Sequence, residues 1–167
     1  MRRLLLGRAF SLAAAAVLTG CGFRLREPPR FAYATLGLNA PDGSPLMDDL
    51  RRQLAIGGGL QVVSGAQLAT ADVILDMQRE QREKVVVGVN ASGGVREFQL
   101  RLRVQFRVRA RDGRELIAST ELLQQRDISF SESAALAKES EEALLFRHMQ
   151  IDLAQQMLRR LAAVRPS

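Results

Sequence analysis

The chain has 167 residues, 47% of them hydrophobic, with 24 basic and 18 acidic side chains and a net charge of +6. Three of the basic residues, Arg2, Arg3 and Arg8, lie in the first 20 positions, so the other 147 residues of the 167 carry only +3. This small excess argues against a nucleic-acid binder that works through bulk charge. A length of this order is sufficient for one domain with a core, and a single cysteine excludes a disulfide framework.

The first 21 residues have the parts of an export signal in the usual order. A basic start precedes an apolar run over Ala9–Leu18, and the run ends at Leu18-Thr-Gly-Cys21. About ten apolar residues are too few to span a bilayer as a mature helix. Small residues before a lone cysteine resemble the lipobox of bacterial lipoproteins, in which the signal is cut before the cysteine and its thiol carries lipid. The alternative is a simple secretory signal followed by an unmodified cysteine.

This pattern predicts three segments. Residues 1–20 form a signal peptide, residues 21–30 form a lipidated tether that contains Pro28-Pro29, and residues 31–167 form a single domain. Cys21 is the predicted lipidation site.

The sequence pattern in the first half of the domain predicts a strand, a helix and a short strand. Phe31–Leu38 alternates as a strand does. Ser44 is suited to cap a helix that begins at Pro45, whose core-facing stripe is Leu46, Leu50 and Leu54. Leu60–Val63 is a short apolar strand candidate.

The second half begins with two extended segments. Val73, Leu75 and Met77 start a strand whose apolar face is lost over Gln78–Lys84 and resumes over Val85–Val89. Residues 98–110 are apolar at every even position and polar at every odd one, which predicts a long antiparallel strand with one wet face.

The turn after this strand decides its register with the next one. A two-residue loop at Asp112-Gly113 would bury Glu115 and Glu121 under the apolar face. We therefore prefer a three-residue loop, Arg111-Asp112-Gly113, with Gly113 left-handed. That register sets these pairs opposite each other: Val108 and Leu116, Phe106 and Ala118, Leu102 and Leu122, Arg109 and Glu115, and Arg103 and Glu121.

A long helix is predicted from the low 130s to about Val164. Ser129-Phe-Ser-Glu132 has capping-box spacing, and the core stripe is Phe146, Met149, Leu153, Met157, Leu161 and Val164. The order of elements implies an α+β, two-layer domain. It has an about four-stranded, mostly antiparallel sheet with two amphipathic helices packed on one face.

No motif of an enzyme is present. The chain has no Gly-x-Ser-x-Gly, P-loop or paired-glycine dinucleotide fingerprint, and no nucleophile–base pair. His148 stands alone, and no His/Cys/Asp set has the spacing of metal ligands. We expect no catalytic activity, no cofactor and no metal.

Three short motifs resemble one family of envelope proteins. Cys21-Gly-Phe-Arg-Leu-Arg26 looks like the mature start of the LPS-assembly lipoproteins of Gram-negative bacteria, the LptE family. Ala135-Leu-Ala-Lys-Glu139 resembles the segment that opens the last helix of that family, and Glu97-Phe-Gln99 is similar to the start of its long strand.

The resemblance implies a non-enzymatic lipoprotein on the periplasmic side of the outer membrane. It implies a complex with the large LptD β-barrel, support for assembly of that barrel, and binding of LPS during delivery to the outer leaflet. Gly22 replaces the aspartate that retains many lipoproteins at the inner membrane. The alternative is an auxiliary lipoprotein of another envelope lipid-transport complex. No nucleic-acid partner is expected.

The resemblance also implies candidate LPS-binding residues. Lys138 matches the lysine that contributes in the family, and its simpler interpretation is a helix lysine paired with Glu141 or Glu142. The family's second basic residue comes from the loop before the long strand. No arginine occupies that loop position here, so Arg96 is the nearest substitute, or else a charge at the strand end. Arg101 and Arg107 are two further candidates, because neither has an acid opposite it in the preferred register. The simpler interpretation is that both belong to a solvated sheet face.

Overall fold

The computed structural model describes residues 29–57 and 59–166. The predicted signal peptide, Cys21 and most of the predicted tether lie outside these residues. The described elements are β1 (Thr35–Asn39), α2 (Pro45–Gly57), β2 (Gln61–Val63), β3 (Val73–Val89), β4 (Val95–Ala110), β5 (Glu115–Ser129) and α3 (Ala135–Ala163).

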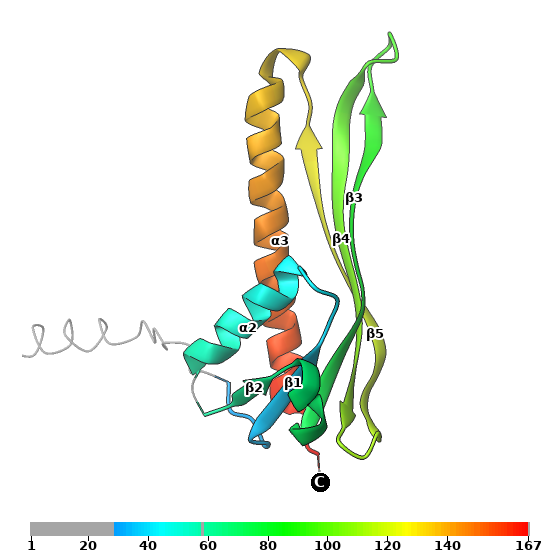
Figure 1. The fold of residues 1–167 in the computed structure, drawn as a ribbon. Helices are drawn as coiled ribbons and strands as arrows, with labels where there is room; N and C mark the ends of the chain where they lie inside the picture. Colours follow the sequence, from blue (N-terminus) through cyan, green and yellow to red (C-terminus); the bar gives the residue numbers. More distant parts are fainter. Residues whose placement is uncertain (1–28, 58, 167) are drawn as a thin grey trace, which may run out of the picture.

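Within the described residues the strands form one five-stranded sheet in the order β2-β1-β3-β4-β5. Both helices pack on the same face of it, with α3 beside β4 and β5 and α2 against the lower part of α3 (Figure 1). The predicted α+β class is confirmed, with five strands in place of about four. The additional strand is the short β2, which follows the α2 crossover and pairs in parallel with β1. On its other side, β1 pairs in parallel with β3.

Strand β3 is continuous across the stretch where its apolar face is lost. It pairs with β4 from Val73 opposite Ala110 to Val89 opposite Val95, with bulges after Met77 and near Gly88. The two strands form a long hairpin that rises beside α3. Backbone pairing with β4 therefore maintains β3 where its side chains do not alternate in polarity.

The turn between β4 and β5 forms as predicted, but the register beyond it does not. Gly113 has φ +90°, and Arg109 lies opposite Glu115. Irregularities between Glu115 and Thr120 then shift β5 by two residues, so that Val104 lies opposite Leu122 and Phe106 opposite Thr120. The residues predicted to lie directly opposite Val108, Phe106, Leu102 and Arg103 are therefore wrong. Arg103 still forms an ion pair with Glu121, which lies diagonally across the two strands. Because a shift of two preserves the side-chain face, β4 still buries its even positions.

The two helices begin differently. Ser44 caps α2 as predicted, since the Met47 backbone N–H donates to its Oγ at 3.1 Å. The predicted capping box is wrong, because α3 follows a single 3-10 turn and its N-cap residue, Ala134, makes no side-chain hydrogen bond. The predicted core stripe of α3 is confirmed, with all six residues buried against the sheet and α2.

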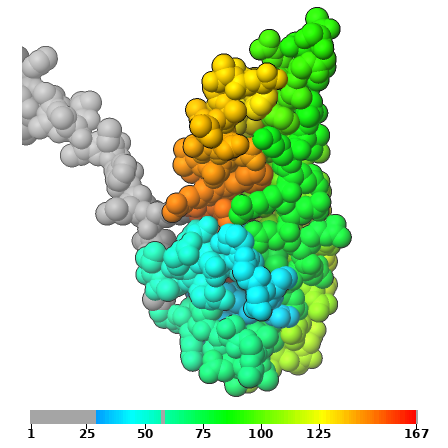
Figure 2. Space-filling view, turned by 45° about the horizontal axis from the view of Figure 1, so that its top comes forward, coloured from blue at the N-terminus to red at the C-terminus, as the bar shows by residue number. Residues whose placement is uncertain are grey.

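The core is not spread evenly along the molecule. In β3 the buried residues end at Met77, and in α3 they begin at Phe146. The lower half therefore holds most of the packing between sheet and helices. In the upper half the end of the β3–β4 hairpin projects beyond the first turns of α3 (Figure 2).

Candidate functional site

A pocket of about 150 Å³ lies in the upper half, between the first turns of α3 and the sheet. Its apolar wall is formed by Phe98, Ile128 and Phe130, and the two phenylalanine rings meet edge to face at 5.3 Å between centroids. Two ammonium groups also line it, those of Lys84 and Lys138. These are the only lysines of the sequence, so the chain's two lysines converge on one small site.

Lys138 reaches the pocket from the first turns of α3. Its Nζ donates to Ser129 Oγ at 2.9 Å and pairs with Glu141 Oε2 at 2.8 Å. Its side chain is 22% exposed. The pairing with Glu141 is the one that simple helix spacing predicts, and the contact with the end of β5 also directs the ammonium toward the sheet.

Lys84 reaches the pocket from β3. It lies opposite Leu100, which is fully buried, so both side chains are on the face that α3 covers. Its Nζ pairs with Glu142 Oε2 at 2.6 Å and lies 4.4 Å from the centroid of the Phe98 ring. An ammonium over an aromatic face is favourable by about 0.5–1 kcal/mol at exposed sites.

Lys84 is not among the site residues predicted from the sequence. The signal was present, because the apolar alternation of β3 fails at positions that face α3. At those positions Arg82 lies over the Phe146 ring, and Lys84 lies over the Phe98 ring. Only the pairing of β3 with β4 shows that these cations face the helix rather than solvent.

Arg96 lies near the pocket but does not line it. It is exposed and falls at the irregularity where β4 has one residue more than β3. Its carbonyl accepts the Phe130 backbone N–H at 2.7 Å, which ties it to the aromatic wall.

Arg101 and Arg107 do not converge with Lys138. They occupy odd positions of β4, on the sheet face opposite the buried even positions. Each has an acid opposite it on β3, Glu83 for Arg101 and Asp76 for Arg107. The reason for selecting them was therefore incomplete, because it considered the pairing with β5 alone.

Arg107 belongs to a cluster around a buried carboxylate. Asp76 Oδ2 accepts from Arg107 Nε at 3.0 Å and from Arg109 Nε at 2.8 Å, and its Oδ1 accepts from Asn39 Nδ2 at 2.7 Å. Burial alone raises the pKa of Asp76, but the hydrogen bonds from Arg109, Asn39 and Arg107 outweigh it and hold the pKa below its ordinary value. This cluster joins β1, β3 and β4.

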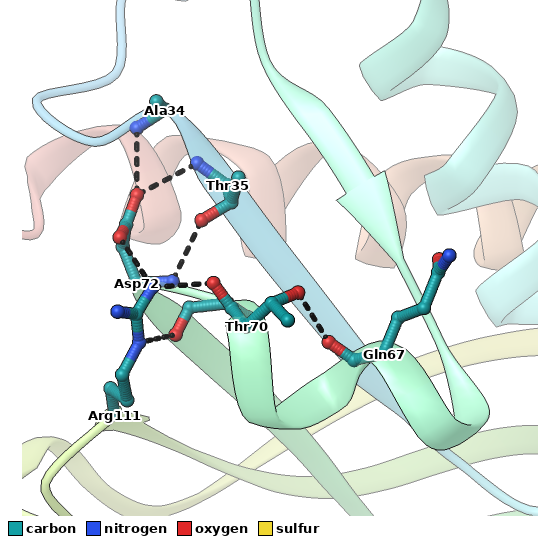
Figure 3. A network of polar contacts seen from close by, with 7 residues as sticks. Ala34, Thr35, Gln67, Thr70, Asp72 and Arg111 are labelled. Carbon is teal, nitrogen blue, oxygen red and sulfur yellow. Dashed lines mark hydrogen bonds and ion pairs between the residues drawn. The ribbon is translucent and has the colours of Figure 1, made fainter.

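A larger, open pocket of about 780 Å³ lies at the lower end, between the start of β3, the β4–β5 turn and the end of α3. Its arginines are engaged with the protein itself. Arg111 donates to the carbonyls of Thr70 and Ala71 and pairs with Asp72 (Figure 3). Hydrogen bonding from Thr35 is the main cause that lowers the pKa of Asp72. The network anchors β1 to β3, so we assign this end a structural role.

Within residues 29–57 and 59–166, no three His, Cys, Asp or Glu side chains are grouped as metal ligands. Neither helix described there has an apolar stretch sufficient to cross a membrane. The upper pocket offers two ammonium groups beside an apolar wall, with Glu139 and Glu142 also in its lining. Ammonium groups beside an apolar wall suit a phosphorylated amphiphile.

A family model for lipopolysaccharide-assembly proteins, LptE, matches residues 30–161. The chain belongs to the LptE family. This membership implies an envelope lipoprotein with a role in lipopolysaccharide assembly, and it confirms the family indicated by the sequence motifs. No protein with curated function matches the chain.

Solved structures of lipoproteins share the LptE family fold seen here. Lipoprotein B from Nitrosomonas europaea is 32% identical, with a TM-score of 0.73 over 85% of this chain and 91% of that one. Rare lipoprotein B from Shewanella oneidensis is 24% identical, with a TM-score of 0.65 over 77% and 94%. A minor lipoprotein from Acinetobacter baumannii is 23% identical, with a TM-score of 0.61 over 80% and 94%.

Proposed function

We propose that this LptE family member binds lipopolysaccharide in the upper pocket and acts, without catalysis, in its delivery to the outer leaflet of the outer membrane. The position of Lys138 at an aromatic-walled pocket carries the proposal. Lipid A presents phosphates beside acyl chains, and an ammonium group beside apolar side chains complements both. Arg96 lies beside Phe130 in space, because its carbonyl accepts the Phe130 backbone N–H, and it extends the cationic surface there.

The protein acts at the periplasmic side of the outer membrane, held there by lipid on Cys21 and docked to the LptD β-barrel, whose assembly it supports. More than one acyl chain is needed for durable anchoring. Arg101 and Arg107 lie on the sheet face away from the pocket, so their role is contact with the barrel rather than with the ligand in the pocket.

The decisive experiment on the ligand compares wild type with Lys138→Glu. The variant weakens lipopolysaccharide binding and leaves the melting temperature nearly unchanged, because Lys138 pairs only with exposed or half-exposed groups. Unaltered binding removes Lys138 from the site.

Partner and anchor are tested on native material. Purification from detergent-solubilised outer membranes recovers a large heat-modifiable barrel, whereas recovery of inner-membrane transporter subunits favours the alternative lipid-transport complex. Mass spectrometry of the mature N-terminus finds acylated Cys21, and a bare thiol on a freely soluble protein contradicts the anchor.

A further inference from the structure

We propose that Glu142 and Glu141 form a carboxylate latch on the upper pocket, and that Lys84 is its second ligand-binding cation. In the structure each glutamate pairs with one of the two ammonium groups. A phosphate headgroup binds by taking both ammonium groups from these carboxylates. This inference rests on the proposed function and adds to it a residue and a competing internal ligand.

Two ion pairs at the pocket carry this proposal. Lys84 Nζ lies 2.6 Å from Glu142 Oε2, and Lys138 Nζ lies 2.8 Å from Glu141 Oε2. Both carboxylates belong to α3, less than two helical turns after Ala135, where the described helix begins. Glu142 itself lines the pocket, as does Glu139. The cationic charge of the site is therefore neutralised from within until the carboxylates move aside.

The two ion pairs are weak enough for a phosphate to displace the carboxylates from the ammonium groups. The Lys84 and Glu142 side chains are 37% and 24% exposed, and those of Lys138 and Glu141 are 22% and 47% exposed. Ion pairs so accessible to water contribute about 0–1 kcal/mol each. A phosphate monoester carries about −1.5 to −2 charges with three acceptor oxygens, so one ligand can replace two separate carboxylates.

The dimensions of the pocket fit a headgroup and not a lipid chain. A volume of about 150 Å³ is below the roughly 300 Å³ at which pockets for drug-sized ligands begin, so the pocket suits a single phosphate group. Two exposed apolar side chains are next to lining residues in the strand pairing or along the chain. Val86 lies opposite Phe98 on β3 and is 48% exposed, and Leu136, which follows Ala135 in α3, is 81% exposed. The phosphate occupies the pocket, and the acyl chains extend beyond it toward these side chains.

If the same ion pairs have a purely structural role, removal of the carboxylate is expected to change ligand affinity in the opposite direction. If Lys84–Glu142 serves only to hold the β3–β4 hairpin against α3, removal of either charge loosens the pocket and lowers affinity. If the pair is a latch, removal of the carboxylate frees the ammonium and raises affinity. The direction of the change in Glu142→Gln therefore separates the two roles.

The test measures binding of the full mature chain, made with Cys21→Ser so that no acyl anchor inserts into the membrane, to phosphatidylcholine vesicles that contain lipid A. Plain phosphatidylcholine vesicles are the blank. We expect Lys84→Gln to weaken binding about tenfold, as for loss of one charge-assisted hydrogen bond. We expect Glu142→Gln to strengthen it by up to about fivefold, the equivalent of one exposed ion pair. Inorganic phosphate as a competitor distinguishes recognition of free phosphate from recognition of the lipid headgroup.

The matched control is Glu121→Gln, which makes the same charge change at a residue paired with Arg103, an odd position of β4. A gain in Glu142→Gln no larger than in this control overturns the latch. In the double variant Lys84→Gln/Glu142→Gln the gain disappears, because the freed cation is absent; a gain that persists also overturns the latch.

The outcomes also separate this inference from the proposed function. If Lys138→Gln loses binding and Lys84→Gln does not, Lys84 is not a ligand-binding residue and the proposed function stands. If wild type binds lipid A vesicles no better than plain vesicles, the proposed function itself fails. Circular dichroism melts confirm that each variant is folded before its binding is compared.

Discussion

Strands β3, β4 and β5 and helix α3 run through both the lower and the upper half of the molecule, yet the two halves differ in what these elements bury. In the lower half β3 is buried from Val73 to Met77, and α3 from Phe146 onward is packed against the sheet and α2. In the upper half no residue of β3 after Met77 and none of α3 before Phe146 is fully buried. Only β4 and β5 supply buried side chains there, among them Leu100 and Ile128.

This contrast separates stability from recognition. The hydrophobic effect scales with apolar area removed from water, so the lower half supplies most of the free energy of folding. The upper half is maintained by backbone pairing and by the ion pair between Lys84 of β3 and Glu142 of α3, which leaves other side chains available to a ligand. Local regions with few buried contacts are also those that open most readily.

The strongest test of this division truncates two leucines on α3. Leu153 is fully buried, and Leu144, nine residues earlier, is 52% exposed. We expect Leu153→Ala to lower the free energy of unfolding by about 2–5 kcal/mol, and Leu144→Ala to change it by less than about 0.5 kcal/mol. Urea denaturation followed by circular dichroism measures both. Equal losses in the two variants contradict the division.

Substitution of Asp76 is expected to give the next largest change in the free energy of unfolding, and this change depends on pH. Asp76→Asn removes a buried carboxylate that pairs with two arginines, at a cost of about 2 kcal/mol near neutral pH. This is less than the cost for a fully buried pair, because Arg107 is 46% exposed. The pKa of Asp76 is lowered by folding, so its contribution is complete above the unfolded value of about 3.9 and is lost as the pH falls through the lower folded value.

The measurement is thermal unfolding of wild type and Asp76→Asn at pH 6 and at successive values below 4. The difference between the two melting temperatures narrows as the pH falls, because wild type loses the same interaction by protonation. A difference that stays constant with pH shows that the cluster contributes through packing rather than charge.

The sequence predicted best what depends on local spacing. The Ser44 cap, the leucines of α2, the six core residues of α3 and the left-handed Gly113 follow from turns of helix or from a single tight turn, and all are confirmed. The parallel pairing of β1 and the partners of β3 depend on contacts far apart in the chain. No local pattern specifies them, and the bulges of β5 moved its register by two residues without a signal in the alternation of β4.

The candidate site was predicted in part for the same reason. Lys138 was selected from a local motif, whereas Lys84 becomes a candidate only once β3 is paired with β4 and covered by α3. Arg107 was judged without its partner on β3, Asp76, because only the neighbour that follows β4 in the chain was considered.

The smallest effect is expected where the wet sheet face carries an exposed ion pair. Arg103 Nη1 lies 2.5 Å from Glu121 Oε1, with side chains 28% and 47% exposed, on the same strand and face as Arg107 and Arg109. Glu121→Gln therefore changes the free energy of unfolding by at most about 0.5 kcal/mol. Urea denaturation beside Asp76→Asn checks it. Asp76 and Glu121 both pair with arginines of β4, but we expect their substitutions to differ severalfold in effect because Asp76 is buried and Glu121 is exposed to water. A loss near 2 kcal/mol for Glu121→Gln contradicts burial as the deciding variable.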